Sequence, residues 1–126
     1  MRIEYSCTRT VFLIGKFAIK VPTGRYSFSS FLRGLIGNIS EKNIYRSCSG
    51  EIREAICPIV FTLPLGLCVV MLRCSPLEPE ETPDFIKLTH VGKWVLPCEH
   101  KIHSFGRLNG KIVAIDYGDH PHGDYK

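Results

Sequence analysis

The sequence predicts an α+β fold, in which helices pack on an antiparallel sheet. Three observations support this class. Short apolar, β-branched runs separated by turn residues occupy residues 1–22 and 56–72, as expected for strands. From Ser27 the apolar residues recur at steps of three and four, which is typical of an amphipathic helix. Near the end of the chain, Asn109-Gly110 separates two short strands, and this pair favours the type I′ turn of a β-hairpin.

Two pairs of strands are predicted before the hairpin. Residues 1–22 have the pattern of a meander, in which TVFLIG and FAIKVP are joined by a tight Gly-Lys turn. Residues 56–72 carry no charge and approach the length of a membrane span, but two prolines and a glycine interrupt them. Two buried strands at 59–63 and 67–72, around a Pro-Leu-Gly turn, explain this run better.

Two helical regions are predicted from periodic apolar residues. Either Ser27 or Ser29 is expected to cap the first, and glycines at 34 and 37 weaken it, so that Ser40 caps a second helical stretch. The stripe predicted to face the core consists of Phe28, Phe31, Leu32, Leu35, Ile36 and Ile39. The other helix lies within residues 84–96. Asp84 is near its start, and the residues facing inward are Phe85, Leu88 and either Val91 or Val95.

Composition limits the classes of function. The chain has 126 residues, which is one domain, and its 44% apolar and 22% charged residues are ordinary for a globular protein. The net charge of +4 comes from scattered Lys and Arg, a spacing that does not favour a nucleic acid and is compatible with an acidic protein partner. Six cysteines without a secretory signal before them predict reduced thiols and a cytoplasmic protein with no membrane segment.

Three short motifs carry a resemblance. FAIK ends at Lys20, EHKIHS contains Glu99, Lys101 and Ser104, and DYG begins at Asp116. A helix and a strand pair separate the first motif from the second, and the predicted hairpin lies between the second and the third. In this order the motifs resemble the strand lysine, the catalytic loop and the metal-binding Asp-Phe-Gly of the protein kinase-like fold.

The resemblance implies a fold and a set of roles. The fold would be a reduced kinase-like small lobe over residues 1–76, a linker at 77–83, a helix and active-site hairpin at 84–118, and a polar tail at 119–126. Lys20 would hold nucleotide phosphates with Glu41 as its partner, Glu99 and Lys101 would be catalytic, and Asp116 and Ser104 would bind metal. Mg²⁺ and ATP would be the cofactors, because phosphoryl transfer depends chiefly on charges placed around the migrating group.

The sequence also departs from the family's pattern. Glu99 stands in place of the catalytic Asp, Ser104 in place of the metal-binding Asn, and the segment SCTRTV lacks the glycines of a phosphate-covering loop. On an ideal helix Glu41 lies nearly opposite the predicted apolar stripe, which argues against its pairing with Lys20. Only eight residues follow Gly118, too few for the activation segment and the platform that hold a protein substrate.

These departures favour a catalytically degenerate, kinase-like protein that binds a protein partner. The resemblance extends to short kinase-like proteins of bacterial and phage type, which implies modulation of a host protein or defence system. The alternative is a small, active Mg·ATP-dependent phosphotransferase, and a third interpretation is an unrelated α+β domain with chance motifs. Both kinase-like hypotheses require residues 20, 101 and 116 to converge on one pocket.

Two further groups of residues favour ordinary roles. Histidines and acids near Cys98 and in the tail lack the paired spacing of a structural zinc site; they are His100, His103, Asp119, His120 and His122. Trp94 and Phe85 are expected in the core rather than on a stacking surface.

Overall fold

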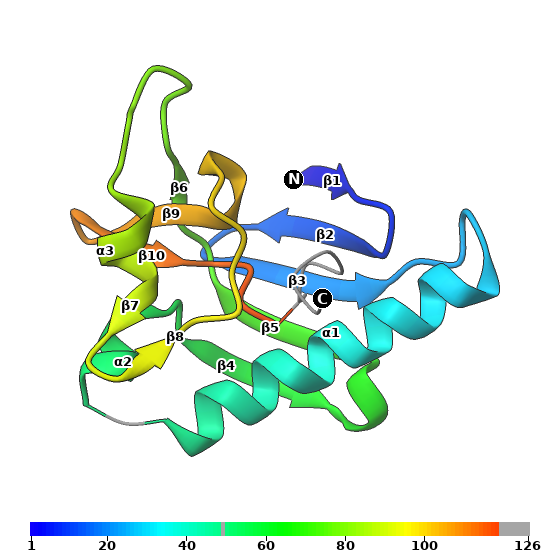
Figure 1. Ribbon diagram of the computed structural model, residues 1–126. Coiled ribbons are helices and arrows are strands. Elements are labelled where there is room, and N and C mark those ends of the chain that lie inside the picture. The colour runs from blue at the N-terminus through cyan, green and yellow to red at the C-terminus, as the bar shows by residue number, and fades with distance from the viewer. Residues whose placement is uncertain (49, 119–126) are drawn as a thin grey trace.

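The computed structural model describes residues 1–48 and 50–118, which form an α+β fold with antiparallel sheets, as predicted (Figure 1). The main sheet has the strand order β1-β2-β3-β5-β4, with every neighbouring pair antiparallel. Its strands are β1 (Arg2–Tyr5), β2 (Arg9–Ile14), β3 (Phe17–Pro22), β4 (Ile59–Leu63) and β5 (Cys68–Leu72). The predicted meander and the predicted strand pair are therefore parts of one sheet, in which β3 pairs with β5.

The second half of the described chain forms two small sheets. The first has the order β10-β9-β6, built from β6 (Ser75–Pro76), β9 (Phe105–Leu108) and β10 (Lys111–Ala114). The predicted hairpin is confirmed: Asn109 and Gly110 both have positive φ, 53° and 80°, as a type I′ turn requires. The second sheet pairs β7 (His90–Val91) with β8 (Trp94–Val95).

A single long helix, α1 (Phe28–Ser47), packs across β3 (Figure 1). The Ser27 side chain caps it by accepting a hydrogen bond from the backbone N–H of Ser30, 3.0 Å away. The prediction of a separate helical stretch capped by Ser40 is wrong, because the helix continues to Ser47. The prediction for its core-facing side is wrong in part. The buried residues of α1 are Gly34, Gly37, Asn38 and Glu41. Of the predicted stripe, Phe31, Leu35 and Ile39 are half-buried, whereas Phe28, Leu32 and Ile36 are exposed.

Close packing explains this reversal. A Cβ on Gly34 would overlap the carbonyl oxygen of Thr8 and the ring of Pro22, so only glycine lets the helix approach the sheet so closely there. Near the helix centre, the Asn38 amide donates to the carbonyl oxygens of Lys20 (3.2 Å) and Gly66 (2.9 Å). Small size and hydrogen bonding therefore decide which side of α1 is fully buried, whereas Phe28, Leu32 and Ile36 remain exposed.

The region 84–96 is only partly helical. Asp84 caps α3 (Phe85–Thr89) by accepting from Lys87 N–H, as expected, but the chain then turns at Gly92, where φ is +61°. The helix itself ends at Thr89, and the Gly92-Lys93 turn joins β7 to β8. The expectation of a core position for Trp94 is wrong, since its side chain is 67% exposed, whereas Phe85 packs against the core.

The short helices and the core complete the fold. α2 (Glu51–Ala55) follows α1, η1 (Pro64–Gly66) links β4 to β5, and η2 (Ile102–Ser104) precedes β9. β4 is an edge strand with exposed side chains, so the prediction of two buried strands holds only for β5. None of the helices in the described part of the chain combines the length and apolar character that crossing a membrane requires. The buried core is made of Ile56, Cys57, Val69, Met71, Leu77, Leu96, Cys98, Phe105, Val113, Ala114 and Tyr117.

Candidate functional site

The centre of the candidate site is an ion pair between β3 and α1. The Lys20 ammonium nitrogen lies 3.1 Å from both carboxylate oxygens of Glu41. Both side chains are buried, and the same ammonium also donates to the backbone carbonyl of Ile115. The geometric argument that placed Glu41 away from Lys20 is therefore wrong. The angular position of Glu41 on the helix was right, but the apolar stripe used as a reference is not the buried side of α1, since Phe28, Leu32 and Ile36 are exposed.

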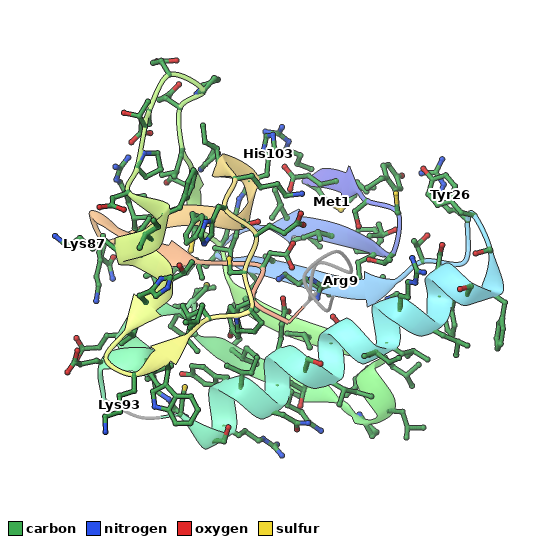
Figure 2. All side chains as sticks on the ribbon, in the orientation of Figure 1. Met1, Arg9, Tyr26, Lys87, Lys93 and His103 are labelled. Atoms are coloured by element: carbon green, nitrogen blue, oxygen red, sulfur yellow. The ribbon has the colours of Figure 1, made fainter. Side chains whose placement is uncertain are left out.

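Arg9 of β2 enters the same cluster. Its guanidinium donates to both carboxylate oxygens of Glu41, at 2.9 and 3.1 Å, and to the side-chain oxygen of Asn38 at 2.9 Å. It also reaches the Asp116 carboxylate, with a distance of 2.6 Å between Nη2 and Oδ1. Arg9 is only 5% exposed, and Figure 2 shows it inside the molecule, whereas the labelled Lys87, Lys93 and Tyr26 point outward.

The turn before β2 fixes the direction of this arginine. The Ser6 hydroxyl accepts from the Arg9 backbone N–H and donates to the Arg9 carbonyl, both at 3.0 Å. These local hydrogen bonds are typical of a serine-led turn. They hold the first residue of β2 in place, so that its long side chain crosses between the sheet and α1.

The Asp116-Tyr117-Gly118 segment follows β10 and packs against α1. A Cβ on Gly118 would overlap Glu41 and the carbonyl oxygen of Gly37, so the backbone passes very close to the helix. The Tyr117 hydroxyl donates to the carbonyl oxygen of Cys57 at 2.9 Å, within the core. This anchoring places the Asp116 carboxylate, whose side chain is 32% exposed, at the edge of the buried cluster.

Charge balance holds this cluster together. Burial alone would raise the pKa of Glu41, but the positive charges of Arg9 and Lys20, together with their hydrogen bonds, outweigh it and lower the pKa below its usual range. Glu41 is therefore ionised at neutral pH. Two cations, Arg9 and Lys20, face two carboxylates, Glu41 and Asp116, and these four side chains balance one another in charge.

The predicted catalytic residues lie elsewhere. Glu99 and Lys101 form an ion pair of 3.2 Å at the surface, with side chains 39% and 51% exposed. Within residues 1–48 and 50–118, no hydrogen bond or ion pair links either side chain to the buried cluster. Of the three positions expected to converge, 20 and 116 belong to one cluster, and Lys101 pairs with Glu99 instead.

Ser104 is connected to the cluster through Ile115. Its carbonyl oxygen accepts from the N–H of Ile115 at 2.9 Å, and the carbonyl oxygen of Ile115 accepts from Lys20. Its side-chain hydroxyl is buried and has no hydrogen-bond partner among the described residues. Nearby, burial and the negative charge of Asp116 raise the pKa of the Cys98 thiol to about 12, so this cysteine is a neutral thiol.

These residues do not fit Mg²⁺ as they are arranged. Magnesium requires about six oxygen ligands in octahedral geometry, usually including one or two carboxylates. The Asp116 carboxylate is already bonded to the Arg9 guanidinium, and Ser104 offers only a neutral hydroxyl. In the described part of the chain no three His, Cys, Asp or Glu side chains are grouped as metal ligands would be.

Two of the predicted histidines lie near this region. His100 lies 3.2 Å from the Thr89 hydroxyl and stacks on Phe85 with ring centroids 5.9 Å apart. His103 is an exposed residue of η2, visible in Figure 2. The polar tail with Asp119, His120 and His122 lies outside the described residues.

The sequence reasoning missed Arg9 and Asn38. The signal for Asn38 was present, because residues 34, 37, 38 and 41 follow the spacing of one helix face and are small or polar. Arg9 had a weaker signal: a charged residue at the start of an otherwise apolar strand.

We compared the chain with protein-family models, with curated proteins and with solved structures, and none of the three comparisons gave a match.

Proposed function

We propose that this chain is a reduced, kinase-like protein that binds a protein partner and does not catalyse phosphoryl transfer. The expected convergence of residues 20, 101 and 116 is met only by Lys20 and Asp116, because Lys101 pairs with Glu99 instead, so the proposal does not include a catalytic role for Lys101. The order of the elements supports the kinase-like interpretation. A lysine strand, a helix carrying its glutamate, two further strands, a hairpin and an Asp-Tyr-Gly segment follow one another, and the first and last of these meet at Lys20, Glu41 and Asp116.

The position of Arg9 is the main observation that supports a protein without phosphotransferase activity. A kinase places its strand lysine and its metal-bound Asp around the phosphates and Mg²⁺ of ATP. Here a guanidinium of the chain itself bridges Glu41 and Asp116. This internal cation balances the carboxylates that a metal would otherwise balance, which supports a site that does not hold Mg·ATP.

An exposed apolar face on α1 supports the binding role. We call Phe28, Leu32 and Ile36 the outer stripe; they succeed one another at intervals of four residues along one side of the helix, and all three are exposed. Leu65 in η1, which packs against α1, is also exposed and has a positive φ of 64°. Contiguous exposed apolar residues commonly mark protein interaction sites. The free thiols of the chain support a reducing, cytoplasmic setting for this partner.

Nucleotide binding tests the proposal most directly. Wild-type protein should show no change in melting temperature with millimolar Mg·ATP, whereas a ligand at about a hundred times its dissociation constant stabilises by about 2.7 kcal/mol, or roughly 10 °C. Saturable binding of a fluorescent ATP analogue that Lys20→Ala abolishes and Lys16→Ala retains would contradict the proposal. Lys16 is the matched control, because it is an exposed lysine in the turn just before β3.

Such binding would favour the second candidate function, a small active phosphotransferase. The observation behind this alternative is that Lys20 pairs with Glu41, the ion pair that active kinases also need. Transfer of radiolabelled phosphate to a substrate or to the chain itself, lost in Asp116→Asn, would establish it.

The partner-binding half of the proposal has its own test. A photo-crosslinking amino acid placed at Ile36 should give a discrete crosslinked product in an extract of the source organism. The same group at Lys111, an exposed position on the β9–β10 hairpin, should give none. Equal products at both positions, or none at Ile36, would rule out the outer stripe as the binding face.

A further inference from the structure

Two cysteines outside the charged cluster lie in direct contact. The sulfur atoms of Cys57 and Cys74 are 3.5 Å apart, and the residues are separated by 17 positions in the chain. Cys57 is fully buried just before β4, and Cys74 is partly exposed just after β5. Both sulfurs lie near the carbonyl oxygen of Leu72, at 3.1 Å for Cys57 and 4.0 Å for Cys74. The two thiols therefore approach as neighbours from different segments.

The two thiols differ in chemical character. The hydrogen bond with Cys74, reinforced by burial, raises the pKa of Cys57. The hydrogen bond from Cys57 lowers the pKa of Cys74, against the opposing effect of burial, and the positive charge of Lys20 acts in the same direction. The thiolate is the form that reacts with oxidants. Cys74 is thus the reactive and accessible partner, and Cys57 is the buried thiol beside it.

We propose that Cys57 and Cys74 are a peroxide-sensitive modification site, at which oxidation forms a reversible disulfide between the start of β4 and the end of β5. This inference does not depend on the proposed function. It assigns a covalent state to two residues that take no part in the cluster of Arg9, Lys20, Glu41 and Asp116.

The reaction balances with hydrogen peroxide as the oxidant. The Cys74 thiolate attacks one peroxide oxygen, the O–O bond breaks, hydroxide leaves, and Cys74 becomes a sulfenic acid. The Cys57 sulfur then attacks the Cys74 sulfur, the S–O bond breaks, and the hydroxyl leaves as water with the proton of Cys57. The proton that Cys74 released on becoming a thiolate converts the hydroxide to water. In total two thiols are oxidised to one disulfide, and one peroxide is reduced to two molecules of water.

The surroundings determine what the bond would move. A disulfide bond is about 2.05 Å long, so the sulfurs must approach by about 1.5 Å. Both backbone polar groups of Cys57 are hydrogen-bonded. Its N–H donates to the carbonyl oxygen of Ala114 at 2.8 Å, and its carbonyl oxygen accepts from the Tyr117 hydroxyl. Cys74 packs against Gly106, because a Cβ added to Gly106 would lie only 2.7 Å from the Cβ of Cys74. The bond therefore links β5 to the residue that anchors Tyr117, next to Asp116.

The test uses the full chain, a small molar excess of hydrogen peroxide, alkylation of remaining thiols and mass spectrometry. We expect a mass loss of about 2 Da before alkylation, a crosslinked peptide containing Cys57 and Cys74, and full reversal by dithiothreitol. The oxidised chain should melt several degrees higher, because a loop of this length is closed in the unfolded state. Oxidation of the exposed Cys7 while Cys57 and Cys74 remain thiols would overturn the proposal.

Variants assign the order of the two steps. Cys57→Ala should accumulate a sulfenic acid at Cys74 that dimedone traps, at several times the wild-type yield, whereas Cys74→Ala should leave Cys57 unlabelled. Cys7→Ser is the matched control and should form the disulfide like the wild type. Dimedone labelling of Cys57 in the absence of Cys74, equal to that of Cys74 in the absence of Cys57, would contradict the assignment. Peptide mapping of the wild type decides whether the disulfide forms even if a core variant fails to fold.

Discussion

Arg9 and Asp116 are joined by an ion pair of 2.6 Å, although 107 residues separate them in the chain. The pair ties the first residue of β2 to the residue that follows β10 and Ile115. Through Glu41, the same guanidinium ties both to α1. One side chain therefore connects the sheet, the helix and the Asp-Tyr-Gly segment, and the integrity of the site depends on it.

Replacing Arg9 by methionine should strongly destabilise the protein. The change keeps much of the apolar length of the side chain but leaves the buried Glu41 with Lys20 as its cation in this cluster. Removing one partner of a buried ion pair typically costs about 3–5 kcal/mol. Urea denaturation should show a loss of this size, and Arg9→Lys should lose less, because an ammonium retains the charge but not the bidentate geometry.

The control for this measurement is Arg2→Met. Arg2 pairs with Glu4 at 3.7 Å on the surface, with side chains 67% and 51% exposed. Such exposed pairs contribute about 0–1 kcal/mol. Equal losses for Arg9→Met and Arg2→Met would mean that the Arg9 cluster does not stabilise the fold.

Acid should weaken the folded state through Glu41. Its pKa is lower in the folded protein than its usual value of 4.5, so its contribution to stability is complete above that value. The contribution is lost as the pH falls through the folded pKa, because Glu41 is then protonated in the folded state too and no longer attracts the charges of Arg9 and Lys20. Unfolding free energies measured from pH 7 down to acid should fall for the wild type and follow a flatter curve for Glu41→Gln.

The surface residue Glu4 provides the comparison for this pH profile. Glu4→Gln should retain the acid-dependent slope of the wild type, because its carboxylate is exposed and its ion pair is long. If Glu41→Gln and the wild type lose stability in parallel below pH 4.5, then Glu41 is not the group that titrates.

Helix α1 should tolerate no side chain at position 34. In an isolated helix Gly34→Ala would gain about 1 kcal/mol from helix propensity. Here the added methyl group would overlap the backbone oxygen of Thr8, so we expect a net loss of about 1–3 kcal/mol instead. Gly24→Ala is the matched control: no atom lies within 4 Å of its added Cβ, and its stability should hardly change. A stabilised Gly34→Ala, measured by thermal unfolding, would mean that α1 does not approach the sheet so closely.

Local patterns predicted much of the fold. The Gly15 turn, the Asn109-Gly110 turn and the strands beside them depend on neighbouring residues, and these were predicted correctly. The inner side of α1 depends instead on contacts between distant segments. Hydrophobic periodicity indicated that Ile36 faces the core, whereas the approach permitted by Gly34 and the hydrogen bonds of Asn38 turn the helix the other way.

The same reasoning explains what could be predicted of the site. Lys20, Glu41 and Asp116 could be selected from the sequence because each belongs to a recognisable motif or is a natural partner of one, and the structure brings them into one cluster. Arg9 belongs to none, and its importance follows only from the distance that its long side chain spans between β2 and α1. Charge alone does not reveal such a residue in a sequence where arginines are common.

The Ser104 hydroxyl has no hydrogen-bond partner among the described residues, and removing it should therefore not destabilise the fold. A buried polar group without a hydrogen bond costs free energy, so Ser104→Ala should leave stability unchanged or raise it by up to about 1 kcal/mol. The comparison is Thr89→Val, which removes a buried hydroxyl that donates to the carbonyl oxygen of Phe85 at 2.8 Å. This change should cost about 1 kcal/mol in urea denaturation.

The same Ser104→Ala variant also distinguishes the partner-binding protein from the phosphotransferase alternative. If its hydroxyl is a metal ligand, as the phosphotransferase alternative requires, Mg²⁺ with a nonhydrolysable ATP analogue should stabilise the wild type and not Ser104→Ala. If Arg9 is the cation of this site, the melting temperatures of both proteins should be equally insensitive to Mg²⁺ and nucleotide. We expect the second result, because the Asp116 carboxylate that a metal would share with Ser104 is already bonded to the Arg9 guanidinium.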